Sequence, residues 1–267
     1  YLNCLFDKNK NQPFFLYLPY NTPHSPMQVP DKFWNKYKDK ELGMFNRDKQ
    51  KEDIPFTKAA LAMCENIDWN VGRITQKVEE LGLAENTIII YLSDNGPNGV
   101  RWNGGMKGKK GSTDEGGVRS PMIMKWDGTF DAGKKIKQIA SGIDLLPTLA
   151  DFAGIKLQLE KSLDGKSIKP LLLDKNPNWN ERIIFNHWKG KTSLRNQKFR
   201  LGHQNQLFDM ETDPEQYTNV ADKYPEIYSK LFKAKEQWVN EVASELDENK
   251  ERPFPIEIDF AMTLLVV

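Results

Sequence analysis

Two short, continuous apolar runs constrain the fold of this chain more than any other feature. The segments "PFFLYLPY" (13–20) and "NTIIIYL" (86–92) are bounded by turn residues, a pattern typical of strands buried on both faces. Between them, apolar residues recur at steps of four and three from Ile67 to Leu81, and Gly82 follows, which predicts an amphipathic helix. Strand, helix and strand together predict a right-handed crossover and a parallel sheet.

The alternation of strands and helices continues and then changes. A further strand, "PMIMKW" (121–126), precedes a helix at 141–154 that Asp144 is expected to cap. Short β-like runs then precede a long helix with apolar residues on one side. The sequence therefore predicts an α/β unit over residues 1–170 and a smaller unit over residues 171–267, in which a small antiparallel sheet packs against a helix.

Composition argues against two classes of protein. Hydrophobic residues make up 39% of the chain and aromatic residues 11%, which is enough to bury a core. Because 38 Lys and Arg residues are balanced by 37 Asp and Glu residues, a dedicated nucleic-acid binder is not expected. No uninterrupted apolar run reaches the roughly 18 residues of a membrane span. The chain begins at Tyr1 without a signal-peptide pattern, so we expect its natural start to lie upstream.

A candidate metal site follows the second apolar run. Asp94 and Asn95 come directly after the strand, and open α/β sheets bind ligands at the carboxyl ends of their strands. Carboxylate and amide oxygens suit Ca²⁺ or Mg²⁺. Asp-Asn-Gly is also a common tight turn, so a metal ligand and a structural turn both stay open on these residues alone.

The glycine-rich segment after this turn holds a candidate anion-binding lysine. A nucleotide P-loop requires Gly-Lys-Ser/Thr, whereas the order here is Lys110-Gly111-Ser112, so that reading is rejected. A lysine in a flexible turn, close in sequence to a possible cation, suits the binding of a tetrahedral oxyanion.

A candidate proton donor follows the first apolar run. His24 lies between Pro23 and Pro26, which stiffen the backbone on both sides. A histidine held at the end of a strand can donate a proton to a leaving oxygen near neutral pH. A single histidine is equally compatible with a structural role.

Three segments together resemble one protein family. "PFFLYLPYNTPHSPMQVPDKF", "NTIIIYLSDNG" and "KKGSTDEGGVRSPMIMKW" are similar, in this order, to segments of the sulfatases of the alkaline-phosphatase-like superfamily. The similarity continues through "IDLLPTLADFAGI" and "LFDMETDPEQYTNVA" and covers nearly the whole chain. The resemblance implies a partial alkaline-phosphatase-like sheet flanked by helices, followed by the smaller subdomain. The bacterial sulfatases that act on sulfated glycans are the most similar.

The resemblance implies a role for each candidate residue. Asp94 and Asn95 would be two ligands of the active-site cation, usually calcium, with magnesium possible; Lys110 would contact the sulfate ester, and His24 would lie near the leaving-group oxygen. In the family, a formylglycine hydrate attacks sulfur, and a sulfated enzyme intermediate then expels sulfate. The implied substrate is a sulfated carbohydrate or an aryl sulfate, and the implied location is periplasmic or secreted.

The chain departs from the family pattern at the nucleophile. Formylglycine arises in a C/S-x-P-S/A-R motif, and neither Cys4 nor Cys64 lies in such a motif. The family's amino-terminal acidic metal ligands are also missing. The chain therefore resembles the carboxyl-terminal half or so of a sulfatase, with formylglycine expected in the missing amino-terminal part, and we expect this chain alone to be inactive.

Two other functions and one further site stay open. A phosphoryl-transfer relative would share the sheet, although such enzymes usually build two-metal sites from more Asp and His. A non-catalytic module that binds anionic sugars would use only this half-site. In the smaller unit, His187, Trp188 and Arg195 are candidates for a sugar subsite, and they equally fit ordinary packing and surface positions.

Overall fold

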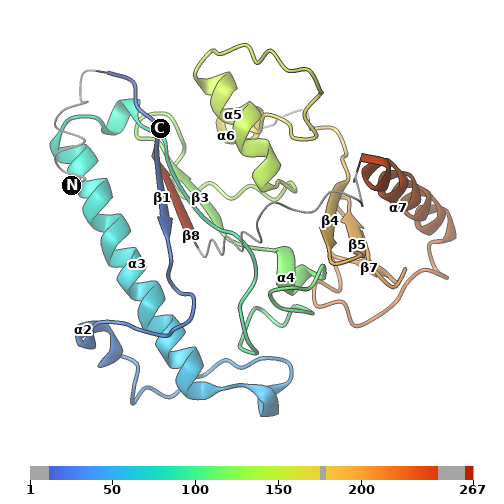
Figure 1. Ribbon diagram of the computed structural model, residues 1–267, viewed down its shortest axis with the longest axis horizontal. Helices are drawn as coiled ribbons and strands as arrows, with labels where there is room; N and C mark the ends of the chain where they lie inside the picture. Colours follow the sequence, from blue (N-terminus) through green and yellow to red (C-terminus); the bar gives the residue numbers. More distant parts are fainter. Residues whose placement is uncertain (1–11, 175–178, 246–261, 267) are drawn as a thin grey trace.

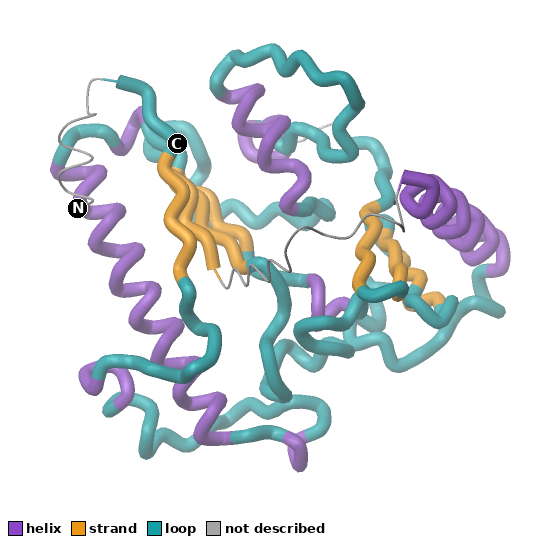
Figure 2. The backbone as a smooth tube through the Cα atoms, in the orientation of Figure 1, coloured by secondary structure: helices purple, strands orange, loops and turns teal. Residues whose placement is uncertain are grey.

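The computed structural model describes residues 12–174, 179–245 and 262–266. Two four-stranded sheets organise the chain, with strand orders β1-β8-β2-β3 and β4-β5-β6-β7. Figures 1 and 2 show that loops and the short helix α4 (Glu115–Val118) lie between these sheets. The mixed α/β architecture is as predicted.

The first sheet differs from the predicted parallel sheet. Its strands are β1 (Leu16–Tyr20), β2 (Ile89–Ser93), β3 (Met122–Lys125) and β8 (Met262–Val266). β1 and β2 run in the same direction, but β8 lies between them and pairs antiparallel with both. β3 is also antiparallel to β2. The prediction of a parallel sheet was therefore wrong, because apolar periodicity identifies a strand without identifying its hydrogen-bonding partners.

β8 lies within residues 171–267, the range that the sequence analysis assigned to the smaller unit. The boundary at residue 171 assigns all later residues to the smaller unit, whereas β8 pairs within the first sheet. β8 supplies backbone donors and acceptors to the facing edges of β1 and β2. A strand can fill such a position from anywhere in the sequence. The division of the chain into two units stays a prediction.

Helix α3 (Ile54–Glu80) connects β1 with β2 and covers one face of the first sheet (Figure 1). It begins well before the predicted start at Ile67. Asp53 caps it by accepting a hydrogen bond from the backbone nitrogen of Phe56, and the early turns bury small residues such as Ala62. The sequence analysis missed these turns because alanines give a weaker apolar pattern than the isoleucines and valines that follow.

Helices α5 (Leu145–Phe152) and α6 (Lys169–Leu173) pack around the residues that follow β3. Asp144 lies at the start of α5, but its side chain does not cap that helix. Its carboxylate instead accepts hydrogen bonds from the backbone nitrogens of Ser141 and Lys166 and from Arg182. Asp144 therefore ties three segments together inside the fold.

The second sheet is the predicted antiparallel sheet with one packed helix. Its strands are β4 (Ile184–Trp188), β5 (Lys191–Arg195), β6 (Phe199–Leu201) and β7 (Leu207–Asp209), and each pairs antiparallel with the next. Helix α7 (Pro225–Glu245) covers one face. Leu231 of this helix is fully buried against a cluster of sheet residues, namely Leu194, Phe199, Leu201 and Leu207.

The remaining helical segments are short: α2 (Asp31–Trp34), η1 (Lys49–Lys51), η2 (Ala84–Asn86) and η3 (Gly142–Asp144). None of the helices in the described part of the chain is long and apolar enough to cross a bilayer.

Candidate active site

The turn after β2 presents oxygen atoms at the carboxyl end of the first sheet. The Asp94 side chain accepts a hydrogen bond from the backbone nitrogen of Asn95 at 2.9 Å. The side-chain nitrogen of Asn95 donates to the carbonyl oxygen of Gly96 at 2.8 Å, which orients the amide group and its oxygen. Asp94 is exposed and Asn95 is half-buried. The two residues form a tight turn and also offer two hard oxygen donors, so the two readings of this segment are compatible.

The loop that carries Lys110 packs directly on this turn. The backbone nitrogen of Lys110 donates to the carbonyl oxygen of Pro97 at 3.0 Å, and that of Gly96 donates to Gly117 at 2.9 Å. The backbone nitrogen of Gly116 donates to Lys107 at 2.7 Å and closes the loop on itself. The structure therefore brings the predicted metal-ligand turn and the predicted anion-binding lysine into one packed substructure.

His24 follows β1, and Asp94 follows β2. Because β1 and β2 run in the same direction, the two residues follow these strands at the same edge of the sheet. The Nδ1 atom of His24 lies 2.8 Å from the carbonyl oxygen of Ser25. A carbonyl oxygen only accepts, so this contact places the proton of the neutral ring on Nδ1, and proton exchange with a substrate falls to Nε2.

A cation at this edge would find a suitable but partial set of ligands. Asp94 and Asn95 supply two oxygens, whereas calcium takes about six to eight. Within the described residues, no group of three or more His, Cys, Asp or Glu side chains is placed to hold a metal ion. The donor chemistry thus fits calcium or magnesium, with these two residues as part of the ligand set.

Between the two sheets, a cavity of about 1270 Å³ reaches the metal-ligand turn. Its lining includes Asp94, Asn95, Arg119 and Arg195, but neither Lys110 nor His24. Much of the remaining lining comes from β3 and the segment that follows it. The site is therefore defined by the packed loops at the sheet edge and not by the outline of this cavity.

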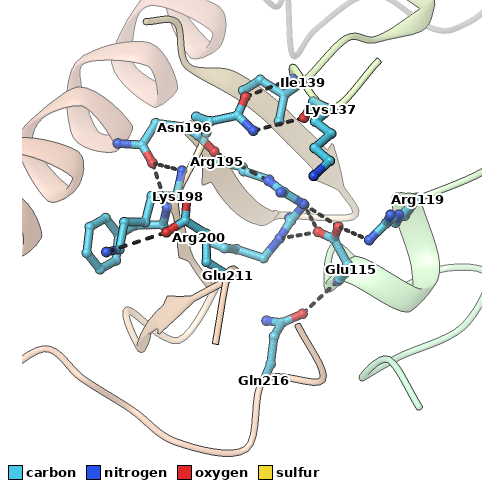
Figure 3. A network of polar contacts seen from close by, with 12 residues as sticks. Glu115, Arg119, Lys137, Ile139, Arg195, Asn196, Lys198, Arg200, Glu211 and Gln216 are labelled. Atoms are coloured by element: carbon cyan, nitrogen blue, oxygen red, sulfur yellow. Dashed lines mark hydrogen bonds and ion pairs between the residues drawn. The ribbon is translucent and has the colours of Figure 1, made fainter. Parts of the chain in front are cut away.

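The sequence analysis missed a buried cluster of charges beside the Lys110 loop (Figure 3). The Glu115 side chain is only 1% exposed, and its Oε2 accepts hydrogen bonds from Nε and Nη2 of Arg200 at 3.0 and 2.7 Å. Arg195 bonds to the other carboxylate oxygen, and Arg119 lies 3.7 Å from it. Burial alone would raise the pKa of Glu115, but attraction to Arg200 and Arg195 outweighs burial and lowers it.

The candidates for a sugar subsite divide between the two faces of the second sheet. His187 bonds to the Thr192 hydroxyl at 2.7 Å, and its ring centre lies 6.1 Å from that of Trp238 in α7. Adjacent residues of a strand point to opposite faces, and a Cβ on Gly111 would lie 3.7 Å from Nε1 of Trp188. The structure therefore places Trp188, and not His187, beside the Lys110 loop.

Arg195, the third candidate for that subsite, has a structural partner. Its side chain is 18% exposed and bonds to Glu115. The sequence signal that could have revealed this buried charge cluster is the alternation along β5 and β6. Leu194 and Leu201 face α7, while Arg195 and Arg200 occupy the alternate positions.

A sheet that carries oxygen donors, a lysine loop and a histidine at the ends of its strands is an arrangement of α/β enzymes that act on esters of tetrahedral oxyanions. The chain belongs to the sulfatase family. The family model named Sulfatase matches residues 1–155, and the model named N-sulphoglucosamine sulphohydrolase, C-terminal, matches residues 109–245. Enzymes of this family generally use formylglycine and a divalent cation.

Individual relatives support the same assignment. The chain is 36% identical over 191 residues to the uncharacterized sulfatase YdeN of Escherichia coli K12, covering 68% of this chain and 32% of that protein. It is 29% identical over 262 residues to an arylsulfatase of Clostridium perfringens, covering 84% of this chain and 53% of the relative.

Solved structures share the fold. A crystal structure of Ps i-CgsB in complex with k-i-k-neocarrahexaose matches with a TM-score of 0.74 and 30% identity, covering 88% of this chain and 52% of the matched chain. The chain thus spans from about a third to about half of the length of these relatives.

Proposed function

We propose that the whole protein is a sulfuric ester hydrolase and that residues 1–267 provide one part of its active site. The observation that carries this proposal is the packing of the Asp94–Asn95 turn against the Lys110 loop, through the bonds from Gly96 to Gly117 and from Lys110 to Pro97. An oxyanion is best held by a cation and an ammonium group that are fixed before the reaction begins. The family match supports a sulfate ester as that oxyanion.

Each residue then has a chemical task. Asp94 and Asn95 would contribute two oxygens to a calcium site, with magnesium as the alternative, and a cation held there would supply positive charge next to the sulfate. Lys110 contacts the sulfate oxygens. In its doubly protonated form, His24 donates the Nε2 proton to the leaving oxygen and becomes the neutral ring with its proton on Nδ1, which prevents the release of a strongly basic alkoxide.

The formylglycine nucleophile and the remaining metal ligands would come from sequence outside residues 1–267. Neither Cys4 nor Cys64 lies in a C/S-x-P-S/A-R motif. The match with the crystallised relative covers 52% of the length of that relative's chain. We propose that this chain alone does not complete the reaction, because the covalent step lacks its nucleophile. A periplasmic or secreted location also stays a prediction.

We propose a sulfated carbohydrate as the substrate class. The Trp188 side chain is half exposed beside Gly111, immediately next to Lys110. A flat aromatic face near the sulfate-binding lysine offers an apolar surface on which a sugar ring can stack. One relative of known structure was crystallised with an oligosaccharide, k-i-k-neocarrahexaose, which is consistent with this class.

The decisive experiment assays the full-length protein on three substrates: a sulfated oligosaccharide, an aryl sulfate and the matching aryl phosphate. We expect hydrolysis of both sulfates, loss of activity on chelation and recovery with Ca²⁺. Hydrolysis of the phosphate alone would instead favour the phosphoryl-transfer relative. Binding of the oligosaccharide without turnover of any ester would identify a non-catalytic sugar-binding module.

A further inference from the structure

The two faces of the second sheet have opposite chemical character. Leu194 and Leu201 pack in the apolar cluster beneath α7. On the alternate positions of the same strands, Arg195 and Arg200 bond to Glu115 in the loop that follows Lys110 (Figure 3). Ser193, in β5, bonds to Thr113 of the same loop. Ser193 and Arg200 are fully or almost fully buried. A buried polar surface of this kind is stable only when its partners are in place, so this face of the sheet is matched to one position of the loop.

Two loop residues, Thr113 and Glu115, are held by this surface and by one glutamine. The carbonyl oxygen of Thr113 accepts hydrogen bonds from the Ser193 hydroxyl at 2.6 Å and from Nη1 of Arg200 at 3.0 Å. The Glu115 carboxylate binds Arg200 and Arg195, and the Glu115 backbone nitrogen donates to Oε1 of Gln216 at 2.8 Å. Both the backbone and the side chain of this segment are therefore fixed from outside the loop.

Glu115 is connected to Lys110 by a short path of bonds. The residue after Glu115, Gly116, donates its backbone nitrogen to Lys107, and Ser112 donates to Lys109, so the loop closes on both sides of Lys110. The next residue, Gly117, accepts from Gly96, which lies two residues after Asp94. A displacement of Glu115 is thus transmitted to the lysine and to the metal-ligand turn.

We infer that Glu115 is a positioning residue, which Arg200 and Arg195 hold so that the second sheet sets the location of Lys110 in the active site. This inference rests on the proposed sulfatase function for its catalytic consequence. It assigns the second sheet an indirect part in catalysis, through the position of the loop, in addition to any contact that it makes with the substrate.

The chain contains a matched control for a purely structural ion pair. Asp144 is 0% exposed, and both of its oxygens lie 2.8 Å from Nη1 of Arg182. Among the described residues, the other bonds of its carboxylate go to Ser141 and Lys166, and none goes to the Lys110 loop. Neutralising Asp144 therefore removes a buried carboxylate of the same kind without releasing the loop.

The test uses the full-length protein with Glu115→Gln, Asp144→Asn, Lys110→Ala and the double variant Glu115→Gln/Lys110→Ala. We expect Glu115→Gln to lower kcat/KM for an aryl sulfate by about 10²-fold, the scale of a misplaced catalytic group. We expect Asp144→Asn to lower the melting temperature and to change kcat/KM by less than about threefold. In the Lys110→Ala background, Glu115→Gln should lower kcat/KM by less than about threefold, because the lysine through which Glu115 acts is gone.

The inference would be overturned if Glu115→Gln lowered kcat/KM by the same factor with and without Lys110. It would also be overturned if Glu115→Gln and Asp144→Asn lowered kcat/KM equally. Hydrogen–deuterium exchange gives a readout that does not depend on activity. Amides of residues 107–117 should exchange faster in Glu115→Gln and at the wild-type rate in Asp144→Asn. If Glu115→Gln fails to fold, Arg195→Lys provides the same comparison at a less buried position.

The two proposals fail in distinguishable ways. A wild-type protein that hydrolyses no sulfate ester overturns the proposed function, whereas the exchange measurement still tests whether Glu115 holds the loop. If the wild-type protein is active and the amides of residues 107–117 exchange at the same rate in Glu115→Gln as in wild type, only the positioning role is overturned.

Discussion

The backbone nitrogen of Gly96 donates to the carbonyl oxygen of Gly117 at 2.9 Å, and this bond joins the turn after β2 to the loop that carries Lys110. The two segments touch so closely that a Cβ on Gly96 would lie 1.8 Å from the carbonyl oxygen of Gly116. Backbone contact at this distance leaves no space for a side chain. The relative position of Asp94 and the Lys110 loop therefore depends on glycine at residue 96.

Replacing this glycine should destabilise the protein. We expect Gly96→Ala to lower the free energy of unfolding by at least about 1–3 kcal/mol, the cost typical of overpacking. Gly72→Ala is the matched control: a Cβ there meets nothing within 4 Å, and Gly72 lies in the interior of α3. That variant should gain up to about 1 kcal/mol from helix propensity. Denaturant unfolding of the full-length protein measures both, and an unaffected Gly96→Ala variant would show that the segments separate easily.

Removing the Asp94 carboxylate should weaken metal binding. We expect Asp94→Ala to lower the affinity for Ca²⁺ and to remove most sulfatase activity, because a charged oxygen ligand is lost. Titration calorimetry of metal-free protein measures the affinity directly. The control is Asp127→Ala, since this carboxylate pairs with Lys125 instead. Wild-type calcium affinity in the Asp94 variant would remove this residue from the ligand set.

Substrates with different leaving groups can test whether His24 acts as a proton donor. His24→Ala should slow a sugar sulfate at least about tenfold more than an activated aryl sulfate, because only the poorer leaving group needs protonation. His203→Ala is the control, as this histidine follows β6 in the second sheet and not the ends of β1 and β2. Values of kcat/KM for the two substrates decide the question. Equal losses on both would assign His24 a structural or orienting role.

Trp188 and His187 offer a comparison of neighbours on opposite faces of β4. Trp188→Ala should raise KM for a sulfated oligosaccharide several-fold and leave a small aryl sulfate nearly unchanged, because a stacking surface near Gly111 is lost. His187→Ala should affect neither KM strongly, since His187 lies against Thr192 and Trp238. A larger effect from His187 than from Trp188 would return the sugar subsite to His187.

Acid should weaken the Glu115 cluster. The pKa of Glu115 is lower in the folded protein than the ordinary value of about 4.3, so its stabilising contribution is fully present above that value. The contribution is lost as the pH falls through the lowered folded-state pKa. We expect the difference in melting temperature between wild type and Glu115→Gln to be constant from pH 7 to about pH 5 and to narrow at lower pH. A difference that stays constant down to pH 3 would contradict an ionised, stabilising Glu115.

The local pattern of the sequence predicted the local parts of the fold. The apolar runs at 13–20, 86–92 and 121–126 correspond to β1, β2 and β3, and the later β-like runs form the antiparallel sheet under α7. These predictions succeed because burial on one or both faces imposes a period on neighbouring residues. The position of β8 between β1 and β2 has no such signature, since strand partners are chosen across the whole chain.

The residues of the candidate site also divide into those with a local sequence signal and those whose place depends on distant residues. Asp94, Asn95 and Lys110 were predicted as site residues from residue type and from their place after a strand, and the structure joins their segments. Glu115 was overlooked, because a carboxylate in a glycine-rich loop usually faces solvent. Only the two arginines of β5 and β6, about eighty residues later, make its burial possible. Alternation along those strands was visible in the sequence, but the partner of the charged face was not.

The two ends of the hairpin between β4 and β5 make different contacts. Its tip is a two-residue turn at Lys189 and Gly190, both with positive φ, and it pairs Trp188 with Lys191. At the opposite end of β5, Arg195 reaches the buried charge cluster. Residues at the tip can therefore be exchanged to alter what lies over Gly111 while the loop-holding end stays intact. Under the proposed function, we expect exchanges at the hairpin tip to alter substrate preference with little effect on the position of Lys110.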